Sequence, residues 1–477
     1  MNEHSPLNPF LAIPYDELED LNLTAREKRD SVTPEEQEQE YRALLAEKKH
    51  IKAVTLCFSD IEGRLHMLDY DKKFLLASAD NLTFDGSSIR GFTAQRESDL
   101  RLQVDWTSFL WLPADLFGAG KVILFANVLN REGEQYASDF RGLLQKYLRD
   151  LKRDEGLTAY VSTEVEGIVV EGMNAEQHFD ERTGFRLIST GGYFHSLPRD
   201  PLRQFIDTSA SVQRAMGFKN EKDHPEVAPS QFEMNFSYTD ALRTADLVQL
   251  YKLVCRQVAN TMGMTATFLP KPVMGINGSG MHTNISLAKD GKNLFYGQGE
   301  EGNLSPFAHD FISRILNHAP EMCLVLNSSV NAYRRLDPHF EAPNQIQVSP
   351  IDRGSMIRIP VGNERTARIE VRSVGPDANP YLLLYTLFQA GLQGEALSSD
   401  SSSDQVRLLP ATIQEAMMLF EGSTLMKSIL GETNVEKYLS YKRMAADRSP
   451  GALGTLIKTS EIIYHHDVTN QALWNLF

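Results

Sequence analysis

The stretch VSTEVEGIVV, residues 161–170, decides how we interpret the fold of this chain. It predicts a β-strand, in which side chains two positions apart share a face, so Glu164 and Glu166 point the same way. Two carboxylates that close repel each other unless one is protonated or a cation lies between them. A solvated outer face is one interpretation. Val165 and the apolar run 168–170 favour burial instead, and two buried acids favour a hard cation.

A second strand-like stretch, ARIEVR at residues 367–372, carries its charges on one face. Arg368, Glu370 and Arg372 share that face, because they lie two positions apart. Ile369 and Val371 occupy the other face. The pattern predicts a strand that is anchored by aliphatic side chains and presents two guanidiniums and a carboxylate in the same direction.

The stretch HPEVAPSQFEMNF, residues 224–236, holds two more acids, Glu226 and Glu233. Their odd spacing would place them on opposite faces of one regular strand. Pro229 lies between them and interrupts a strand ladder, so a bulge or turn could bring both side chains inward. Taken by itself, the spacing does not separate a binding site from ordinary strand acids.

Three glycines precede a histidine in GINGSGMHTNISL, residues 275–287. Glycines let the backbone approach a ligand closely, and a turn at Asn277 and Gly278 could offer amide donors to a carboxylate or phosphate. The alternative is an ordinary hairpin turn followed by His282 as a core histidine with satisfied hydrogen bonds.

Arginines occur in NAYRRLDPHFEAP, residues 331–343, and in SPIDRGSMIRIP, residues 349–360. Arginine binds carboxylate and phosphate through two parallel hydrogen bonds. Arg335, Arg353 and Arg358 could each be a surface charge, but their clustering with ARIEVR favours a shared anionic ligand. A metal-dependent site that handles phosphate would explain these arginines together with the acids and the histidine.

Two further turns carry polar side chains that are unremarkable when considered alone. FDGSSIRGF, residues 84–92, places Asp85 in a tight turn, and STGGYFHS, residues 189–196, places Tyr193 after a pair of glycines. Both are common loop patterns.

The composition restricts the class of protein. The chain has 477 residues, 42% of them hydrophobic, which suffices for a large core or for two domains. Its net charge of -15 argues against a nucleic-acid partner. The three cysteines show no disulfide or zinc spacing, which fits a reducing compartment. Because neither a signal peptide nor a membrane-length apolar run is evident, we expect a cytoplasmic protein that does not bind a membrane.

The order of predicted elements divides the chain into three parts. Residues 1–45 are an N-terminal extension and helix; up to about residue 32 they are polar without steady periodicity, which we interpret as an arm. Thr33, Pro34 and Glu36 then form a helix start with a capping box. Residues 46–145 contain four strand-like runs, and residues 146–477 alternate strands with helices. Strands are predicted at 51–60, 63–71, 99–112 and 121–129, and helices at 33–49, 136–156, 247–263, 305–327 and 378–394.

Taken together and in this order, the motifs resemble the glutamine synthetase family of the bacterial type I. The resemblance runs from about residue 45 to 395 and includes DANPYL at residues 377–382. It implies an α+β fold: a small N-terminal β-grasp domain and a large catalytic domain of curved antiparallel sheet surrounded by helices. It also implies a homo-oligomer of two stacked rings, a dodecamer, with sites between subunits. The small domain would then lend Asp85 to the site of the next subunit.

The resemblance further implies the reaction and its cofactors. ATP would phosphorylate the γ-carboxylate of L-glutamate, and ammonia would attack the acyl phosphate to give glutamine. Two Mg²⁺ or Mn²⁺ ions would take part. The residues that match the first metal site are Glu166, Glu226 and Glu233, and those that match the second are Glu164, His282 and Glu370.

The substrate positions follow from the same resemblance. The residues matching the glutamate site are Asn277, Gly278, Arg335, Glu341 and Arg372. Those matching the ATP site are Asn284, Ser286, Arg353, Arg358 and Arg368, with Arg353 stabilising the transferred phosphoryl group. Those matching the ammonium site are Asp85, Ser88, Tyr193, Glu226 and Glu341. Asp85 would take a proton from ammonium, and Glu341 would close over the site to exclude water.

The chain departs from the family pattern at two of these positions. Asn284 stands where a second histidine is usual, and Gly167 follows Glu166 where an aromatic residue is common, which predicts looser packing there. Three other functions compete with ammonia ligation: a γ-glutamyl-amine ligase that uses a larger amine or polyamine, a non-catalytic assembly or regulatory relative, and an unrelated metal-dependent hydrolase.

Overall fold

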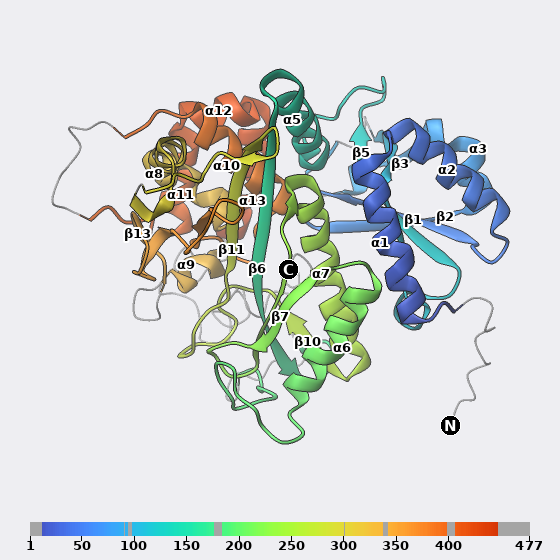
Figure 1. Ribbon diagram of the computed structural model, residues 1–477, viewed down its shortest axis with the longest axis horizontal. Helices are drawn as coiled ribbons and strands as arrows, with labels where there is room; N and C mark the ends of the chain where they lie inside the picture. The colour runs from blue at the N-terminus through green and yellow to red at the C-terminus, as the bar shows by residue number, and fades with distance from the viewer. Residues whose placement is uncertain are drawn as a thin grey trace.

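The computed structural model describes residues 12–89, 91–93, 98–175, 184–299, 301–336, 342–397 and 406–446. Two sheets organise them, and Figure 1 shows these as a smaller part at the N-terminal end and a larger part around two long strands. In the described part of the chain, no helix is both long enough and apolar enough to cross a membrane. The helices and strands alternate through both parts, which confirms the predicted α+β class.

The smaller sheet has five strands in the order β2-β1-β5-β4-β3. Its central pair, β1 and β5, is parallel, whereas the other neighbours are antiparallel. All four strand-like runs predicted in this part are strands. The bounds are β1 Ala53–Ser59, β2 Leu65–Asp71, β3 Leu82–Asp85, β4 Asp99–Trp111 and β5 Lys121–Leu129.

The larger sheet follows the order β13-β14-β15-β11-β6-β8-β7, with β10, β12 and β9 attached to β6 or β11. Its neighbours on this path are antiparallel except for β13 and β14. The bounds are β6 Leu157–Glu171, β7 Asn220–Pro225, β8 Gln231–Phe236, β9 Thr239–Asp240, β10 Met264–Thr267, β11 Met281–Lys289, β12 Lys292–Asn293, β13 Gln345–Ser349, β14 Ser355–Arg358 and β15 Ile369–Val371.

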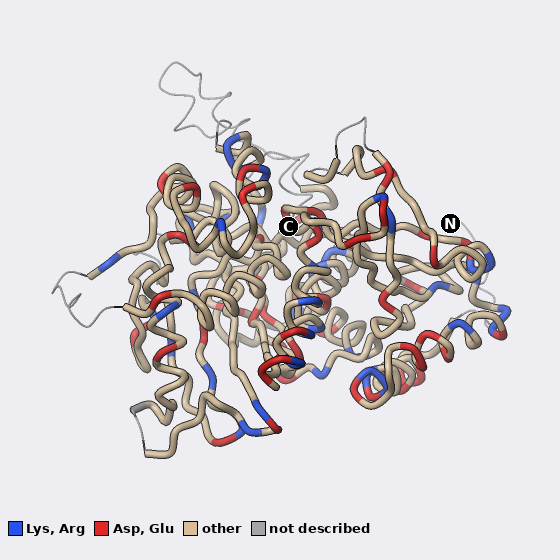
Figure 2. Tube along the Cα trace, turned by 90° about the horizontal axis from the view of Figure 1, so that it is seen from above, with Lys and Arg blue, Asp and Glu red and all other residues tan. Residues whose placement is uncertain are grey.

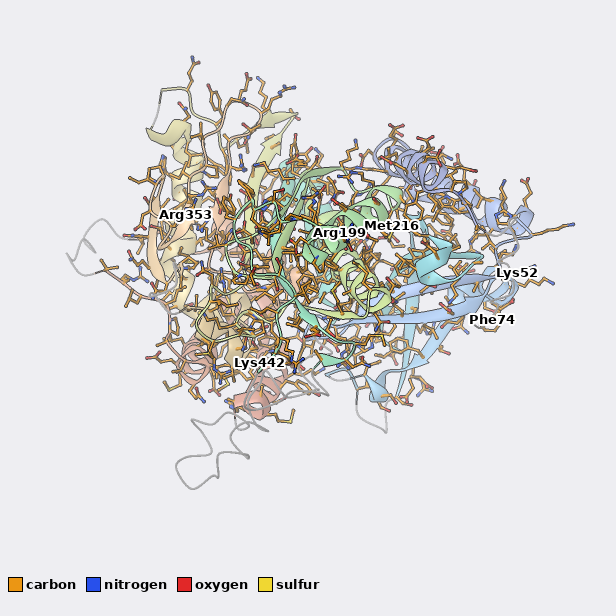
Figure 3. The ribbon with its side chains drawn as sticks, turned by 90° about the horizontal axis from the view of Figure 1, so that it is seen from below. Lys52, Phe74, Arg199, Met216, Arg353 and Lys442 are labelled. Carbon is orange, nitrogen blue, oxygen red and sulfur yellow. The ribbon has the colours of Figure 1, made fainter. Side chains whose placement is uncertain are left out.

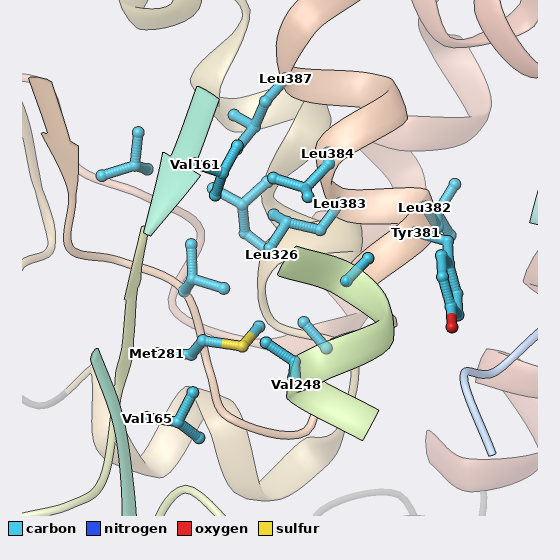
Figure 4. Packing of buried hydrophobic residues seen from close by; sticks show 14 of the residues in the cluster. Val161, Val165, Val248, Met281, Leu326, Tyr381, Leu382, Leu383, Leu384 and Leu387 are labelled. Atoms are coloured by element: carbon cyan, nitrogen blue, oxygen red, sulfur yellow. The ribbon is translucent and has the colours of Figure 1, made fainter. Parts of the chain in front are cut away.

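Strand β6 separates the hydrophobic core from the polar face of the sheet. Its odd-numbered residues Val161 and Val165 are buried, and Figure 4 shows them on the side where Met281, Val248 and Leu326 pack. Helices α7 and α10 cover this side. The even-numbered residues of β6 therefore point to the opposite face, as the strand period requires.

The helices end where their sequences predict. Helix α2 begins with the capping box of Thr33 and Glu36, and α5 ends at Gly156 in the left-handed conformation. The bounds are α2 Pro34–Glu47, α3 Lys72–Ser78, α4 Ala114–Phe117, α5 Phe140–Glu155, α6 Pro201–Ala215, α7 Ala241–Thr261, α8 Pro306–Leu326, α9 Val330–Arg335, α10 Pro380–Gln393, α11 Ile413–Gly422, α12 Thr424–Leu430 and α13 Glu432–Ala446.

The interpretation of the first residues as an arm is wrong for Tyr15–Ser31, which form helix α1. The helix buries Leu18, Asn22 and Ala25 on one side, so its inward stripe is short and interrupted by a polar residue. Asn22 donates to the carbonyls of Trp111 and Ala215 at 3.1 and 2.8 Å and accepts from the amide of Trp111 at 2.8 Å. Helix α1 thus joins strand β4 to helix α6.

A buried arginine joins the smaller sheet to two helices that follow it in the chain. Arg141 of α5 is fully buried and bonds Asp105 of β4 and Asp246 of α7, each at 2.8 Å. The hydroxyl of Tyr381 donates to Asp246 at 2.7 Å. Met216 follows Ala215, which accepts the hydrogen bond from Asn22. Figure 3 shows Met216 between Arg353 at one end of the molecule and Lys52 and Phe74 at the other end. The charges at the surface are mixed, with both signs along the helices (Figure 2).

Candidate active site

The register of the larger sheet brings the predicted site residues together. On β6, Glu164 is paired with His282 of β11 and Glu166 is paired with Glu233 of β8. Glu370 of β15 is paired with Asn284 of β11 and with Arg358 of β14. These pairs lie in successive rows, two residues apart along β6 and β11, on the face opposite the core. Ile369 and Val371 are fully buried on the core face, which confirms the predicted anchoring of ARIEVR.

Glu164, His282 and Glu370 form the first group of metal-ligating side chains. Nδ1 of His282 lies 3.4 Å from Glu164 Oε2 and 3.5 Å from Glu370 Oε1. Burial alone would raise the pKa of Glu164, but the hydrogen bond and charge of His282 and the amide of Asn284 lower it to about 2. Glu164 is therefore ionised at neutral pH and able to bind a cation.

Glu370 is completely buried, and two arginines hold its carboxylate. Arg358 Nε donates to Oε2 at 2.5 Å, and Arg372 Nη1 donates to Oε1 at 2.7 Å. The two guanidiniums offset the charge of an acid that water does not reach. Arg368 instead donates to Asn284 Oδ1 at 2.9 Å, and Asn284 donates to Glu164 Oε1 at 3.1 Å. Asn284 thus links an arginine to the first group.

The second group consists of His224, Glu226 and Glu233. His224 Nδ1 lies 3.7 Å from Glu226 Oε1, and Nε2 lies 3.6 Å from Glu233 Oε1. The chain turns between β7 and β8, where Ser230 adopts a φ of 62°, so both glutamates reach the same face despite their odd spacing. This confirms the turn predicted around Pro229.

Among the described residues, no lysine or arginine forms an ion pair with the acids of the second group. Burial, followed by the charges of Glu166 and Glu164, raises the pKa of Glu226 to about 7. Burial and the same neighbours raise the pKa of Glu233 well above its usual range. Burial also lowers the pKa of His224, which favours the neutral imidazole that ligates metals. A divalent cation would relieve the repulsion among these acids.

Glu166 lies between the two groups. Its Oε2 accepts hydrogen bonds from the amide of Gly280 at 2.7 Å and from Gln231 at 3.2 Å, and its Oε1 lies 4.0 Å from His282 Nε2. Gly167 introduces no gap beside it, because a side chain there would meet the rings of Phe232 and Phe268. The prediction of looser packing at this position is therefore wrong.

A cavity of about 350 Å³ is lined by the second group, by Glu164 and His282 of the first group and by all five predicted arginines, whereas Glu370 is fully buried behind this lining. Within it, Nη1 of Arg335 and Nε of Arg372 are buried donors without a hydrogen-bond partner among the described residues. Such donors fit an anionic ligand. The predicted residues that line the cavity are Glu164, Glu166, Tyr193, Glu226, Glu233, Asn277, Gly278, His282, Arg335, Arg353, Arg358, Arg368 and Arg372.

A second cavity of about 240 Å³ adjoins the first, since Glu164, Lys222, Asn235 and Arg368 line both. Asn284 and Ser286 line it, as do the rings of Tyr160 and Tyr238, which meet edge to face. The two cavities together would accommodate a ligand with separate phosphate and aromatic ends.

Four predicted residues are not part of the described lining of these cavities, and one of them, Glu370, is fully buried beside Arg358 and Arg372. Asp85 and Ser88 lie in the turn after β3 of the smaller sheet and line neither cavity. Their side chains bond each other, with Ser88 Oγ donating to Asp85 at 2.6 Å. Glu341 lies outside the described residues.

Sequence reasoning missed several residues of the site. His224 begins the stretch HPEVAPSQFEMNF and could have been found as a possible ligand beside Glu226. Gln231 donates to Glu166 and to the carbonyl of Gly278, and Phe194 stacks on Tyr193 with ring centroids 3.8 Å apart. Lys222 and Tyr238 had no distinguishing sequence signal.

Comparisons with known proteins agree with this arrangement. The family model described as "Glutamine synthetase, catalytic domain" matches residues 137–452, and "Glutamine synthetase, beta-Grasp domain" matches residues 50–131. The glutamine synthetase of Thermus thermophilus is 35% identical over 84% of this chain and 93% of that protein. The glutamine synthetase of Halobacterium salinarum is 36% identical over 83% and 90%.

Solved structures show the same fold. Plasmodium falciparum glutamine synthetase superposes with a TM-score of 0.79 at 21% identity, covering 89% of this chain and 97% of that chain. A ligand-free form of a protein called GmaS gives a TM-score of 0.74 at 25% identity, covering 88% and 97%. The predicted β-grasp and curved-sheet architecture is thereby confirmed.

Proposed function

The chain belongs to the glutamine synthetase family, and from this premise we propose that it ligates ammonia to the γ-carboxylate of L-glutamate. ATP would be converted to ADP and phosphate, with γ-glutamyl phosphate as the intermediate. One observation carries the proposal: metal-ligating side chains from both groups, and buried arginine donors without a hydrogen-bond partner among the described residues, line one cavity.

The donor sets fit two divalent cations, Mg²⁺ or Mn²⁺. Both groups offer carboxylate oxygens and an imidazole nitrogen, and the ligand atoms within each group lie within 4.8 Å of one another. When bound, the cations would neutralise phosphate charge and raise the electrophilicity of the phosphorus. One would be held by Glu164, His282 and Glu370, and the other by Glu166, Glu226 and Glu233, with His224 as a further ligand.

The arginines would bind the two substrates, glutamate and ATP, at separate sites. The free donors of Arg335 and Arg372 support binding of the glutamate carboxylate, with the glycine-rich loop at Asn277 and Gly278 beside them. Arg353 would stabilise the transferred phosphoryl group. The adjoining cavity suits the nucleotide, because Asn284, Ser286, Arg368 and the rings of Tyr160 and Tyr238 line it, and Arg358 would reach the phosphates from the first cavity.

Ammonium would bind near the second group, where Glu226 and Tyr193 line the cavity. Asp85 and Ser88 lie outside this cavity in the same chain, so we propose that a neighbouring subunit supplies them in a ring-shaped homo-oligomer. Glu341 would complete the ammonium site and exclude water from the acyl phosphate.

The acceptor specificity has one competing interpretation. Tyr193 and Phe194 are 52% and 58% exposed, so this rim of the cavity leaves room for an alkyl group. That openness favours a γ-glutamyl-amine ligase that uses methylamine, ethanolamine or a polyamine. Tyr193 and Glu226 in the cavity, and Asp85 in the chain, favour ammonia.

A phosphate-release assay tests the proposal. Purified protein with glutamate, ATP and Mg²⁺ should release phosphate faster when ammonium is added, and glutamine should form in equal amount. Steady-state comparison of ammonium with methylamine, ethanolamine and polyamines then identifies the acceptor. A higher kcat/KM with an amine would replace the proposed acceptor, and absence of both turnover and Mn²⁺ binding by calorimetry would favour a non-catalytic relative.

A further inference from the structure

A third cavity, remote from the two of the active site, lies where helix α1 meets strand β4 and helix α7. It has a volume of about 20 Å³, enough for a group the size of a water molecule or one ligand oxygen, and it opens to the surface. Its polar lining includes three arginines: Arg26 and Arg29 from α1, and Arg243 from α7. None of these three lines the active-site cavities.

The three guanidiniums have few partners within the described part of the chain. Arg243 is only 6% exposed, yet its side chain makes no hydrogen bond or ion pair there. Arg29 has one weak contact, with Asp240 at 3.5 Å. The side chain of Arg26 has no hydrogen bond or ion pair among the same residues. Within the described residues, Asp240 is therefore the one acid that forms an ion pair with any of these arginines, and its partner is Arg29.

The other acids near the cavity are already engaged. Asp105 and Asp246 both bond the guanidinium of Arg141, at 2.8 Å, and Asp246 also accepts from Tyr381. Asp30 is exposed and acts only at a distance on Arg26 and Arg243. Three arginines and one acid, Asp246, line the cavity, and Asp246 is shared with Arg141, so arginines outnumber acids in the lining.

Arg243 nevertheless stays charged at neutral pH. Burial, followed by the charges of Arg29 and Arg26, lowers the pKa of Arg243 to about 9, which is still well above 7. A buried cation without a partner destabilises the folded state. An anion that enters the cavity would remove this cost and accept hydrogen bonds from more than one guanidinium.

We propose that Arg26, Arg29 and Arg243 form a binding site for a small oxyanion of the phosphate class, between the N-terminal helix and the catalytic part of the chain. One oxygen would enter the cavity and the rest of the anion would remain at its mouth, because the cavity holds only about 20 Å³. The bound anion would fasten α1 to α7 and so stabilise the junction of the two sheets. The site is independent of the acceptor used in the reaction.

Thermal unfolding of the full-length protein tests the site. Inorganic phosphate is titrated without ATP, glutamate or divalent metal, against sodium chloride of equal ionic strength. Phosphate should raise the unfolding midpoint by about 1 to 3 °C more than chloride. Arg353→Gln should keep this rise, which separates the proposed site from phosphate bound in the active site.

Three variants test whether the rise in the unfolding midpoint with phosphate comes from the proposed site. Arg243→Gln should lose the phosphate response and, in chloride, melt at or above the temperature of the unaltered protein, since an unpartnered charge is gone. Arg26→Gln, at a half-buried position, should weaken phosphate binding without preventing folding, and Arg131→Gln on the surface should change nothing. An undiminished phosphate response in Arg243→Gln, or no response in the unaltered protein, would overturn the proposal.

Discussion

Arg372 Nη1 lies 2.7 Å from Oε1 of Glu370, two residues earlier in strand β15. Since Glu370 is fully buried and Arg358 holds its other oxygen, the acid is fixed before any ligand binds. The same oxygen of Glu370 lies 3.5 Å from His282. One carboxylate therefore connects an arginine of the proposed glutamate site to a ligand of the proposed metal site.

Replacing Glu370 tests this connection. We expect Glu370→Gln to fold, because the amide fills the same space, but to lower the rate of phosphate release at least about 100-fold by weakening metal binding. Phosphate release and circular dichroism measure the two effects. Glu171→Gln, whose side chain is 60% exposed at the end of strand β6 of the same sheet, is the matched control. Normal turnover by Glu370→Gln would remove this acid from the mechanism.

Metal affinity should depend on pH through the second group. The pKa of Glu226 is raised to about 7, and burial and neighbouring acids raise the pKa of Glu233 well above its usual range, so both carboxyls bind protons more tightly than an ordinary glutamate. Metal binding must displace these protons, and affinity for Mn²⁺ should rise between pH 6 and 8, by up to about tenfold per unit for each proton displaced. Calorimetry in buffers of different ionisation enthalpy counts the released protons. Equal affinity at both pH values would contradict the assignment.

Stability of the metal-free protein should show the opposite trend. A carboxyl whose pKa is higher in the folded than in the unfolded state binds more protons when folded, so the free energy of unfolding falls as pH rises. For Glu226 this fall begins above the ordinary glutamate pKa of 4.5 and continues to about 7. Urea unfolding at pH 5 and pH 8 measures it. Glu226→Gln should reduce the pH dependence, and saturating Mn²⁺ should reverse it.

The proposed role of Asp85 predicts that its replacement impairs the use of ammonium but not the formation of the acyl phosphate. Hydrogen bonds from Ser87 and Ser88 hold the pKa of Asp85 below its usual range, so the carboxylate is ionised and can accept a proton from ammonium. We expect Asp85→Asn to retain formation of the acyl phosphate but to raise the KM for ammonium, with a smaller defect at alkaline pH, where free ammonia is more abundant. Asp80→Asn, at an exposed position of the same domain, is the control. Full activity of Asp85→Asn at low ammonium would exclude this role.

Helix α1 offers a test of stability away from the active site. Asn22 is fully buried and makes three hydrogen bonds that join β4 to α6. Asn22→Ala leaves a cavity and unpaired backbone groups, so we expect a loss of about 2 to 4 kcal/mol in the free energy of unfolding. Denaturant titration measures this loss. Thr24→Ala, at an exposed position of the same helix, should have little effect.

The sequence by itself determined which side chains share a face within each strand. Alternation along residues 161–170 and 367–372 separates acids from aliphatic residues, because the strand period is two and one face must be buried. Capping residues likewise determined where α2 and α5 begin or end. These signals are local, so they can be read without knowing what lies opposite. The family and the α+β fold were predicted instead from the resemblance of the motifs, taken in order, to the glutamine synthetase family.

Only the tertiary structure decided which strands are neighbours and in what register. Pairing of Glu164 with His282, and of Glu166 with Glu233, joins residues more than sixty positions apart, and no local pattern specifies such partners. The tertiary structure also places His224 next to Glu233. It stabilises helix α1 as well, because the buried side chain of Asn22 donates hydrogen bonds to backbone carbonyls of β4 and α6. The burial of each acid and the charges that surround it depend on the assembled fold, and they determine the pKa values of the site residues.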